Sequence, residues 1–300
     1  MPASTPREIE FRVGGGVRLV GDQRGSDDAP RVFLLHGGGQ TRHAWTETAT
    51  ALAAQGWTTI ALDLRGHGDS DWPPDGGYEI SDFASDVVKV VESLPAAPFV
   101  VGASLGGIAA LAAQGLVDRQ LYAGVVLVDV APRLEPAGIE RIVGFMTAHP
   151  DGFASLDDAA DVIASYLPHR PRPSDLGGLR KTLRQTEDGR WRWRWDVRFL
   201  TGKSDLAGGD PDALRQRAAQ IQRDLSGAAR QLQVPTLLVR GALSDVVSDE
   251  GARELLDVVP RARHVDVAEA SHMVAGDRND AFTATVIEFL EEHRSSSGPH

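Results

Sequence analysis

Apolar positions along the chain gather in short runs that are separated by segments of helical spacing. The runs lie at residues 31–39, 58–64, 99–104, 123–129 and 235–241. Continuous apolar runs of this length are typical of strands that are covered on both faces of a sheet. Helical spacing follows the first, second and third runs, at residues 45–55, 80–94 and 105–116. This alternation predicts an α/β fold with a parallel, doubly wound sheet.

Both ends of the chain extend this pattern. Residues 7–13 and 17–24 flank a glycine triplet and predict a hairpin that pairs at the edge of the sheet. Towards the other end, residues 248–258 and 279–291 have helical spacing, and a strand is expected at 264–268. We expect the tail, residues 295–300, to be disordered.

The alternation stops near Arg133 and resumes at Pro235. The hundred residues between them hold proline clusters and helical-looking stretches. We expect residues 133–230 to form a helical cap over the carboxyl ends of the strands, and residues 1–132 and 231–294 to form the core. Such a cap shapes the pocket beneath it.

A serine between two glycines stands where the run 99–104 meets the next helix. Gly102 and Gly106 have no side chain, so the strand and the helix can approach closely on either side of Ser104. The helix that follows presents its free N–H groups and the positive end of its dipole to the serine oxygen. We therefore predict that Ser104 is a nucleophile.

Two more polar residues follow strands of the predicted sheet. Reacting groups in an open α/β sheet gather beyond the carboxyl ends of the strands. Asp245 follows the run 235–241, and His272 follows the strand at 264–268. A serine needs a base to take its proton, and a histidine base works best when a carboxylate fixes its tautomer. We therefore predict that His272 is the base and that Asp245 orients it.

Two other aspartates end strands as well. Asp129 follows the run 123–129 and is an alternative to Asp245 as the acid, although a local turn role is the favoured interpretation. Asp63 opens the stretch 63–70 and is expected to make turn hydrogen bonds with Arg65 and its neighbours rather than to act in catalysis.

A glycine loop, Gly37-Gly38-Gly39, ends the first apolar run. Such a loop lets a backbone N–H point at a developing oxyanion, and we predict that Gly38 and Leu105 supply the two donors. A tight turn required by packing is the alternative. His36, just before the loop, is expected to be a structural hydrogen-bonding residue rather than a base.

The sequence Trp191-Arg192-Trp193-Arg194-Trp195 alternates aromatic and basic residues within the predicted cap. A period of two places the indoles on one face of an extended segment and the arginines on the other. The tryptophans either glue the cap to the core or line the pocket for substrate. Residues 170–198 hold nine Arg or Lys and four Asp or Glu, a positive charge that favours anionic substrates.

Composition narrows the function classes. The chain has 300 residues, 42% of them hydrophobic, and a formal net charge of −11, which argues against a general nucleic-acid binder. No apolar run approaches the roughly 18 residues of a membrane span, and the first residues lack the apolar centre of a signal peptide, so we expect a cytoplasmic protein. The absence of cysteine removes thiol catalysis and thiolate metal sites, and no histidine cluster suggests a metal.

Taken together, the glycine loop, the stretch 63–70, Gly102-Ala103-Ser104-Leu105-Gly106-Gly107 and Ser271-His272-Met273 resemble the α/β-hydrolase superfamily. The resemblance covers nearly the whole chain outside the cap. It implies an eight-stranded, mostly parallel sheet, a Ser-His-Asp triad, no metal and no cofactor, and a cap inserted after the sixth strand. The sequence resembles the esterase, lactonase and cofactor-free perhydrolase branch. Epoxide hydrolases and haloalkane dehalogenases carry aspartate at the nucleophile position, so Ser104 argues against both.

These features predict an enzyme that cleaves a carboxylic ester or lactone of a small to medium, largely apolar substrate through an acyl-enzyme. A carbon–carbon bond hydrolase and a perhydrolase use the same triad, and a non-catalytic ligand sensor uses the same fold, so these alternatives stay open. The expected partner is a small-molecule substrate. The sequence leaves its identity and the oligomeric state open.

Overall fold

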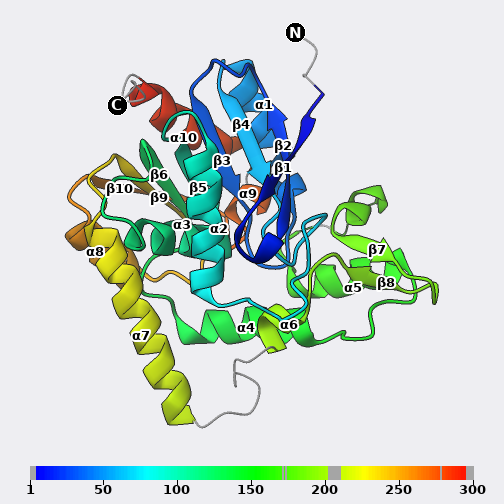
Figure 1. Cartoon of the computed structure of the whole chain (residues 1–300). Coiled ribbons are helices and arrows are strands. Elements are labelled where there is room, and N and C mark those ends of the chain that lie inside the picture. The colour runs from blue at the N-terminus through cyan, green and yellow to red at the C-terminus, as the bar shows by residue number, and fades with distance from the viewer. Residues whose placement is uncertain (1–4, 171, 173, 202–210, 278, 295–300) are drawn as a thin grey trace.

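Eight strands form one sheet at the centre of the computed structural model (Figure 1), which describes residues 5–170, 172, 174–201, 211–277 and 279–294. The strand β2 is antiparallel to both of its neighbours, and the other adjacent pairs are parallel. The predicted mostly parallel, doubly wound α/β sheet is thereby confirmed. In spatial order the strands are β1 (Arg7–Arg12), β2 (Arg18–Arg24), β4 (Thr58–Leu62), β3 (Arg31–Leu35), β5 (Phe99–Ala103), β6 (Gly124–Val128), β9 (Thr236–Gly241) and β10 (Ala262–Val267).

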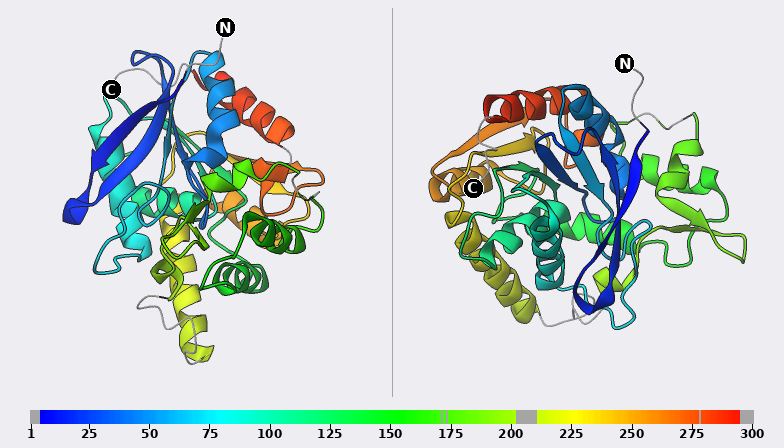
Figure 2. Two further views of the ribbon diagram at one scale, coloured as in Figure 1. Left: turned by 90° about the vertical axis from the view of Figure 1, so that its right-hand side faces the viewer. Right: turned by 45° about the horizontal axis from the view of Figure 1, so that its top comes forward.

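Helices cover both faces of the sheet, which is why the central strands are mainly apolar. Along β3, Phe33 and Leu35 belong to one buried cluster, and Val32 and Leu34 belong to the other. The first cluster lies under α2, α3 and α8, and the second lies under α1 and α10, which Figure 2 shows side by side. The bounds are α1 (Thr46–Ala54), α2 (Ile80–Ser93), α3 (Leu105–Gly115), α8 (Asp249–Val258) and α10 (Asn279–Glu292).

The cap is inserted between β6 and β9, the sixth and seventh strands of the main sheet in chain order. Figure 1 shows most of it beyond one end of the sheet, and it has a small core of its own that contains Phe153, Leu183 and Trp191. The insertion after the sixth strand is therefore as expected. Its elements are α4 (Pro136–Thr147), α5 (Leu156–Tyr166), η3 (Gly177–Lys181), β7 (Leu183–Gln185), β8 (Trp191–Trp193), α6 (Arg198–Thr201) and α7 (Pro211–Arg230).

The last helix of this insertion, α7, joins the cap to the core. Its final turns contribute Leu225 and Ala229 to the cluster beneath α3. The division of the chain at residues 133 and 230 stays a prediction, with the end of α7 packed as part of the core. The tail predicted to be disordered, 295–300, lies outside the described residues.

Backbone hydrogen bonds tie the cap to the loop that follows β4. Gly68 N–H donates to the Arg194 carbonyl at 2.7 Å, and Asp196 N–H donates to the Gly66 carbonyl at 2.8 Å. A β-bridge joins His67 to Trp195 between them. The residues after β8 are therefore fixed against the core by main-chain contacts.

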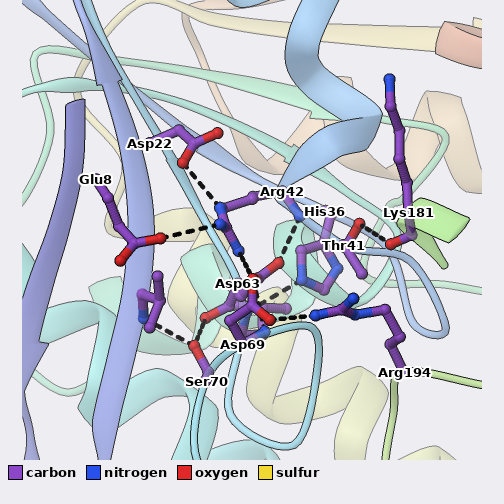
Figure 3. A network of polar contacts seen from close by, with 12 residues as sticks. Glu8, Asp22, His36, Thr41, Arg42, Asp63, Asp69, Ser70, Lys181 and Arg194 are labelled. Atoms are coloured by element: carbon purple, nitrogen blue, oxygen red, sulfur yellow. Dashed lines mark hydrogen bonds and ion pairs between the residues drawn. The ribbon is translucent and has the colours of Figure 1, made fainter. Parts of the chain in front are cut away.

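A buried polar network around Arg42 holds the same loop (Figure 3). Asp63 accepts hydrogen bonds from the Arg42 side chain, from Arg42 N–H at 2.6 Å and from Asp69 N–H at 2.9 Å. Asp69 in turn pairs with Arg194 of the cap. The expected turn role of Asp63 is correct, but its expected contact with Arg65 is not, because the Arg65 guanidinium forms a bidentate pair with Asp86 of α2.

Candidate active site

Ser104 occupies a sharp turn between β5 and α3. Its φ of 45° lies in the left-handed region, which is strained for a residue with a side chain. The glycines on either side make the turn possible: a Cβ on Gly102 would lie 2.7 Å from Gly107 Cα, and one on Gly106 would lie 2.4 Å from the Leu35 carbonyl oxygen. These contacts hold Ser104, the predicted nucleophile, at a turn where its side chain is partly exposed.

His272 is held by a buried carboxylate. Its Nδ1 lies 2.7 Å from Oδ2 of Asp129, the residue directly after β6. Asp129 is fully buried and also accepts hydrogen bonds from Gly241 N–H at 3.0 Å and from Ser244 Oγ at 2.5 Å. The Ser244 oxygen accepts in turn from the N–H of Val246 at 3.1 Å. These contacts fix the carboxylate where it can orient the imidazole.

The predicted pairing of His272 with Asp245 is corrected by this geometry. Asp245 forms a bidentate ion pair with Arg141 of α4 at 2.6 and 2.8 Å, and its side chain is 43% exposed. The guanidinium holds the pKa of Asp245 below its usual range. Both aspartates follow neighbouring parallel strands, so the sequence places them at the same sheet edge. Arg141 of the cap, about a hundred residues away in the chain, pairs with Asp245, and Asp129 is the carboxylate that contacts His272.

One N–H of the glycine loop after β3 has no acceptor among the described residues. Gly37 N–H donates to Gln40 Oε1 at 2.9 Å, and Gly39 N–H donates to His67 Nε2 at 3.1 Å. No acceptor for the Gly38 N–H is found in the described part of the chain. Leu105 is the first residue of α3, and its N–H has no partner within the helix. Both predicted oxyanion donors therefore keep an available N–H.

Two histidines behind this loop are buried and neutral. Burial lowers the pKa of His36 to about 4 and that of His67 to about 3. His36 Nε2 accepts from Leu64 N–H at 3.1 Å, so its Nδ1 is the donor to the Gly37 carbonyl at 2.8 Å. The expected structural role of His36 agrees with these contacts. His67, which the sequence analysis did not single out, follows Gly66 in the stretch already noted for its turn.

A cavity of about 490 Å³ lies between the core and the cap. Ser104, His272 and Gly38 line its core side. The cap side is mainly apolar and includes Ile142, Phe145, Met146, Ile163 and Tyr166 of α4 and α5. A reacting carbonyl beside Ser104 would thus be covered by a hydrophobic wall.

The three cap tryptophans separate into two groups. Trp193 and Trp195 line the cavity, and Trp193 meets Phe145 edge-on at 6.0 Å. Trp191 packs in the cap's own core under the Arg180 guanidinium, 4.7 Å from the ring centroid. Trp191 lies on the same strand as Trp193, and its indole packs against the cap's own core. Contact of any of these tryptophans with substrate stays a prediction, and Trp191 packs within the cap rather than between cap and core.

The arginines of the same stretch are engaged rather than merely solvated. Arg194 pairs with Asp69 of the core and Arg192 pairs with Asp188 at 2.8 Å. Lys181 and Arg170 belong to the cavity lining. Some of the positive side chains of the cap therefore form ion pairs, and others line the cavity.

Replacing the tryptophans one at a time is expected to separate these roles. Trp193→Ala enlarges the cavity and should shift the ratio of kcat/KM between long and short acyl chains by roughly 10-fold. Trp191→Ala leaves a hole in the cap core and should destabilise the fold by about 3 to 5 kcal/mol with the acyl preference unchanged. Melting temperatures and kcat/KM over a series of acyl lengths measure both effects. An unchanged acyl preference in Trp193→Ala would contradict its place in the substrate pocket.

Comparison with known proteins agrees with this fold. Residues 30–278 match the sequence model of the alpha/beta hydrolase fold. The chain is 33% identical to the esterase Rv0045c of Mycobacterium tuberculosis over 95% of its own length and 89% of the relative's. A crystal structure of that esterase superimposes with a TM-score of 0.71 at 30% identity, covering 96% of this chain and 92% of that one.

A second relative has a named substrate. The 2-(acetamidomethylene)succinate hydrolase of Mesorhizobium japonicum is 28% identical over 89% of both chains. A crystal structure of E-2-(acetamidomethylene)succinate hydrolase superimposes with a TM-score of 0.79 at 25% identity, covering 95% of this chain and 100% of that one.

The chain belongs to the α/β-hydrolase family. It is a hydrolase, as the named activities of its relatives and the family itself indicate. Within the residues that the structure describes, no helix is long and apolar enough to cross a membrane, and no group of three or more His, Asp or Glu is arranged to hold a metal ion.

Proposed function

We propose that this protein is a serine hydrolase that cleaves a carboxylic ester or lactone through an acyl-enzyme. The proposal is carried by one observation: the strained Ser104 lines the same cavity as His272, whose Nδ1 lies 2.7 Å from the buried Asp129. Nucleophile, base and orienting carboxylate are the three roles that serine activation requires. Asp129 takes the acid's role in this proposal.

The expected reaction follows from these positions. Ser104 Oγ attacks the substrate carbonyl carbon while His272 takes the hydroxyl proton, and Asp129 stabilises the imidazolium. The N–H groups of Gly38 and Leu105 donate to the resulting oxyanion. Collapse of this intermediate breaks the bond to the leaving alkoxide, which receives the proton from His272. Water, deprotonated by His272, then attacks the acyl-enzyme and releases the carboxylic acid.

The cavity wall supports a small to medium, largely apolar acyl group. A volume of about 490 Å³ is within the range of pockets that bury a drug-sized ligand. The aliphatic and aromatic side chains of α4 and α5 offer few polar partners to such a group. The esterase activity of the relative from Mycobacterium tuberculosis supports an ester as the substrate.

A hydrolysis panel tests the proposal and its alternatives. Esters of C2 to C10 acids, lactones, thioesters and a β-diketone are each incubated with the purified protein, and hydrolysis is measured. A second set of incubations contains hydrogen peroxide and is assayed for peracid. We expect acyl esters or lactones to be cleaved at least 10-fold faster than the diketone. Preferred cleavage of the diketone would replace the proposal with carbon–carbon bond hydrolysis, and no turnover with saturable binding would favour a ligand sensor.

A further inference from the structure

The buried histidines His36 and His67 are neighbours with tilted rings, and both contact the glycine loop. Their ring centroids are 5.1 Å apart, and both side chains are 0% exposed. Each ring uses both of its nitrogens, one as a donor and one as an acceptor. The acyl-transfer steps described above use neither ring, so two buried titratable groups beside the reacting centre have no role in those steps.

His36 holds the peptide group that carries the proposed oxyanion donor. Its Nδ1 donates to the carbonyl oxygen of Gly37 at 2.8 Å, and the Gln40 N–H donates to the same oxygen at 3.1 Å. This carbonyl shares one planar peptide with the N–H of Gly38. In a trans peptide the N–H points away from the C=O, so fixing one group fixes the other. A donor on the carbonyl also polarises the N–H and strengthens its own hydrogen bonding.

His67 holds the next peptide group in the same loop. Its Nε2 accepts from Gly39 N–H at 3.1 Å, while its Nδ1 donates to the Arg65 carbonyl at 2.9 Å. The φ of Gly39 is 77°, in the left-handed region that glycine adopts without strain. The peptides on both sides of the Gly38 Cα are thus each tied to one imidazole nitrogen.

We propose that His36 and His67 are positioning residues that together set the direction of the Gly38 N–H at the oxyanion. This inference rests on the proposed function, because an oxyanion forms only if Ser104 attacks a carbonyl. It makes a specific demand of each ring: a donor at the Nδ1 position of residue 36 and an acceptor at the Nε2 position of residue 67. Mere packing of two aromatic rings makes no such demand.

Asparagine and glutamine separate these demands, because the asparagine amide reaches the Nδ1 position of a histidine and the glutamine amide reaches the Nε2 position. His36→Asn keeps the donor to the Gly37 carbonyl, whereas His36→Gln keeps only the acceptor for Leu64 N–H. His67→Gln keeps the acceptor for Gly39 N–H, whereas His67→Asn keeps only the donor to the Arg65 carbonyl. The amide that preserves the hydrogen bond to the glycine loop is therefore asparagine at position 36 and glutamine at position 67.

The four variants are compared by kcat, KM and affinity for a trifluoromethyl ketone, which forms an oxyanion on Ser104. Loss of one oxyanion donor costs about 100- to 1000-fold in kcat, so a misdirected donor is expected to cost about 10- to 100-fold. We expect this loss, with KM little changed and the ketone bound correspondingly more weakly, in His36→Gln and His67→Asn. Their partners, His36→Asn and His67→Gln, should stay within about 5-fold of the wild type.

Melting temperature and a core variant control for stability. Val90→Ala truncates a buried residue of α2 and should lower the melting temperature with kcat unchanged. The same ranking of the two amides at both positions, or a kcat within 2-fold of the wild type in all four variants, would overturn the proposal. If one pair fails to fold, the other pair decides alone. Turnover that does not depend on Ser104 would instead overturn the proposed function, which is measured in the same series with Ser104→Ala.

Discussion

Ser104→Ala is expected to lower kcat/KM by about 10⁴- to 10⁶-fold, because the variant has no atom that can form the acyl-enzyme. The remaining rate would come from substrate binding and the oxyanion donors alone. The double variant Ser104→Ala/His272→Ala should be little slower than either single variant, since nucleophile and base act as one unit. Steady-state kinetics on the best ester of the panel measure both effects.

Covalent labelling provides an independent measurement of the same residue. A fluorophosphonate should add once to the wild type, as seen by intact mass, and not at all to Ser104→Ala. Ser248→Ala is a suitable control because Ser248 caps α8 outside the cavity, where its loss costs about 1 kcal/mol of stability. It should label and turn over as the wild type does. Labelling of Ser104→Ala at another serine, with activity retained, would contradict the nucleophile assignment.

Most of the core could be predicted from the pattern of apolar residues. Both faces of strands β3 and β5 are covered, so their sequences are apolar apart from Arg31 at the start of β3. The predicted runs contain the observed strands. Gly102 and Gly106 permit the turn at Ser104, because a Cβ at either position would lie less than 3 Å from neighbouring backbone atoms. These are local constraints, and a sequence displays them directly.

The choice between the two aspartates depends on contacts that the sequence does not display. Asp129 and Asp245 follow the parallel strands β6 and β9, which are hydrogen-bonded neighbours. The pairing is decided by Arg141, which comes from the cap, and by the Gly241 N–H and Ser244 hydroxyl on Asp129. Contacts of this kind depend on how the cap packs against the core. The pattern of residues within one cap helix does not specify that packing.

The same limit applies to the cap tryptophans. The period of two predicted a strand, and β8 is one. It did not predict that Trp191 and Trp193 would both pack against the cap's own core while Trp193 also lines the cavity, because the cap segment meets two hydrophobic surfaces within a few residues. A pattern of alternation identifies the element, and the packing partners on each side decide the function of each indole.

Asp129→Asn is expected to lower kcat by about 10³- to 10⁴-fold and Asp245→Asn by less than about 3-fold. In Asp129→Asn the Oδ1 still accepts from Gly241 N–H, so the amide NH₂ takes the place of the oxygen beside His272 Nδ1. Two donors cannot face each other, so the imidazole must adopt the opposite tautomer and place its proton on Nε2. A base protonated there cannot accept the proton of Ser104.

Asp245→Asn provides the matched control, since the change is the same and the residue follows the neighbouring strand. It removes a partly exposed ion pair with Arg141, which contributes at most about 1 kcal/mol to stability. The kcat and melting temperature of both variants are measured on the same ester, and fluorophosphonate labelling rates report serine activation directly. A larger loss of kcat in Asp245→Asn would mean that this carboxylate reaches His272 during turnover, and that Asp129 is a turn residue held by Gly241 and Ser244.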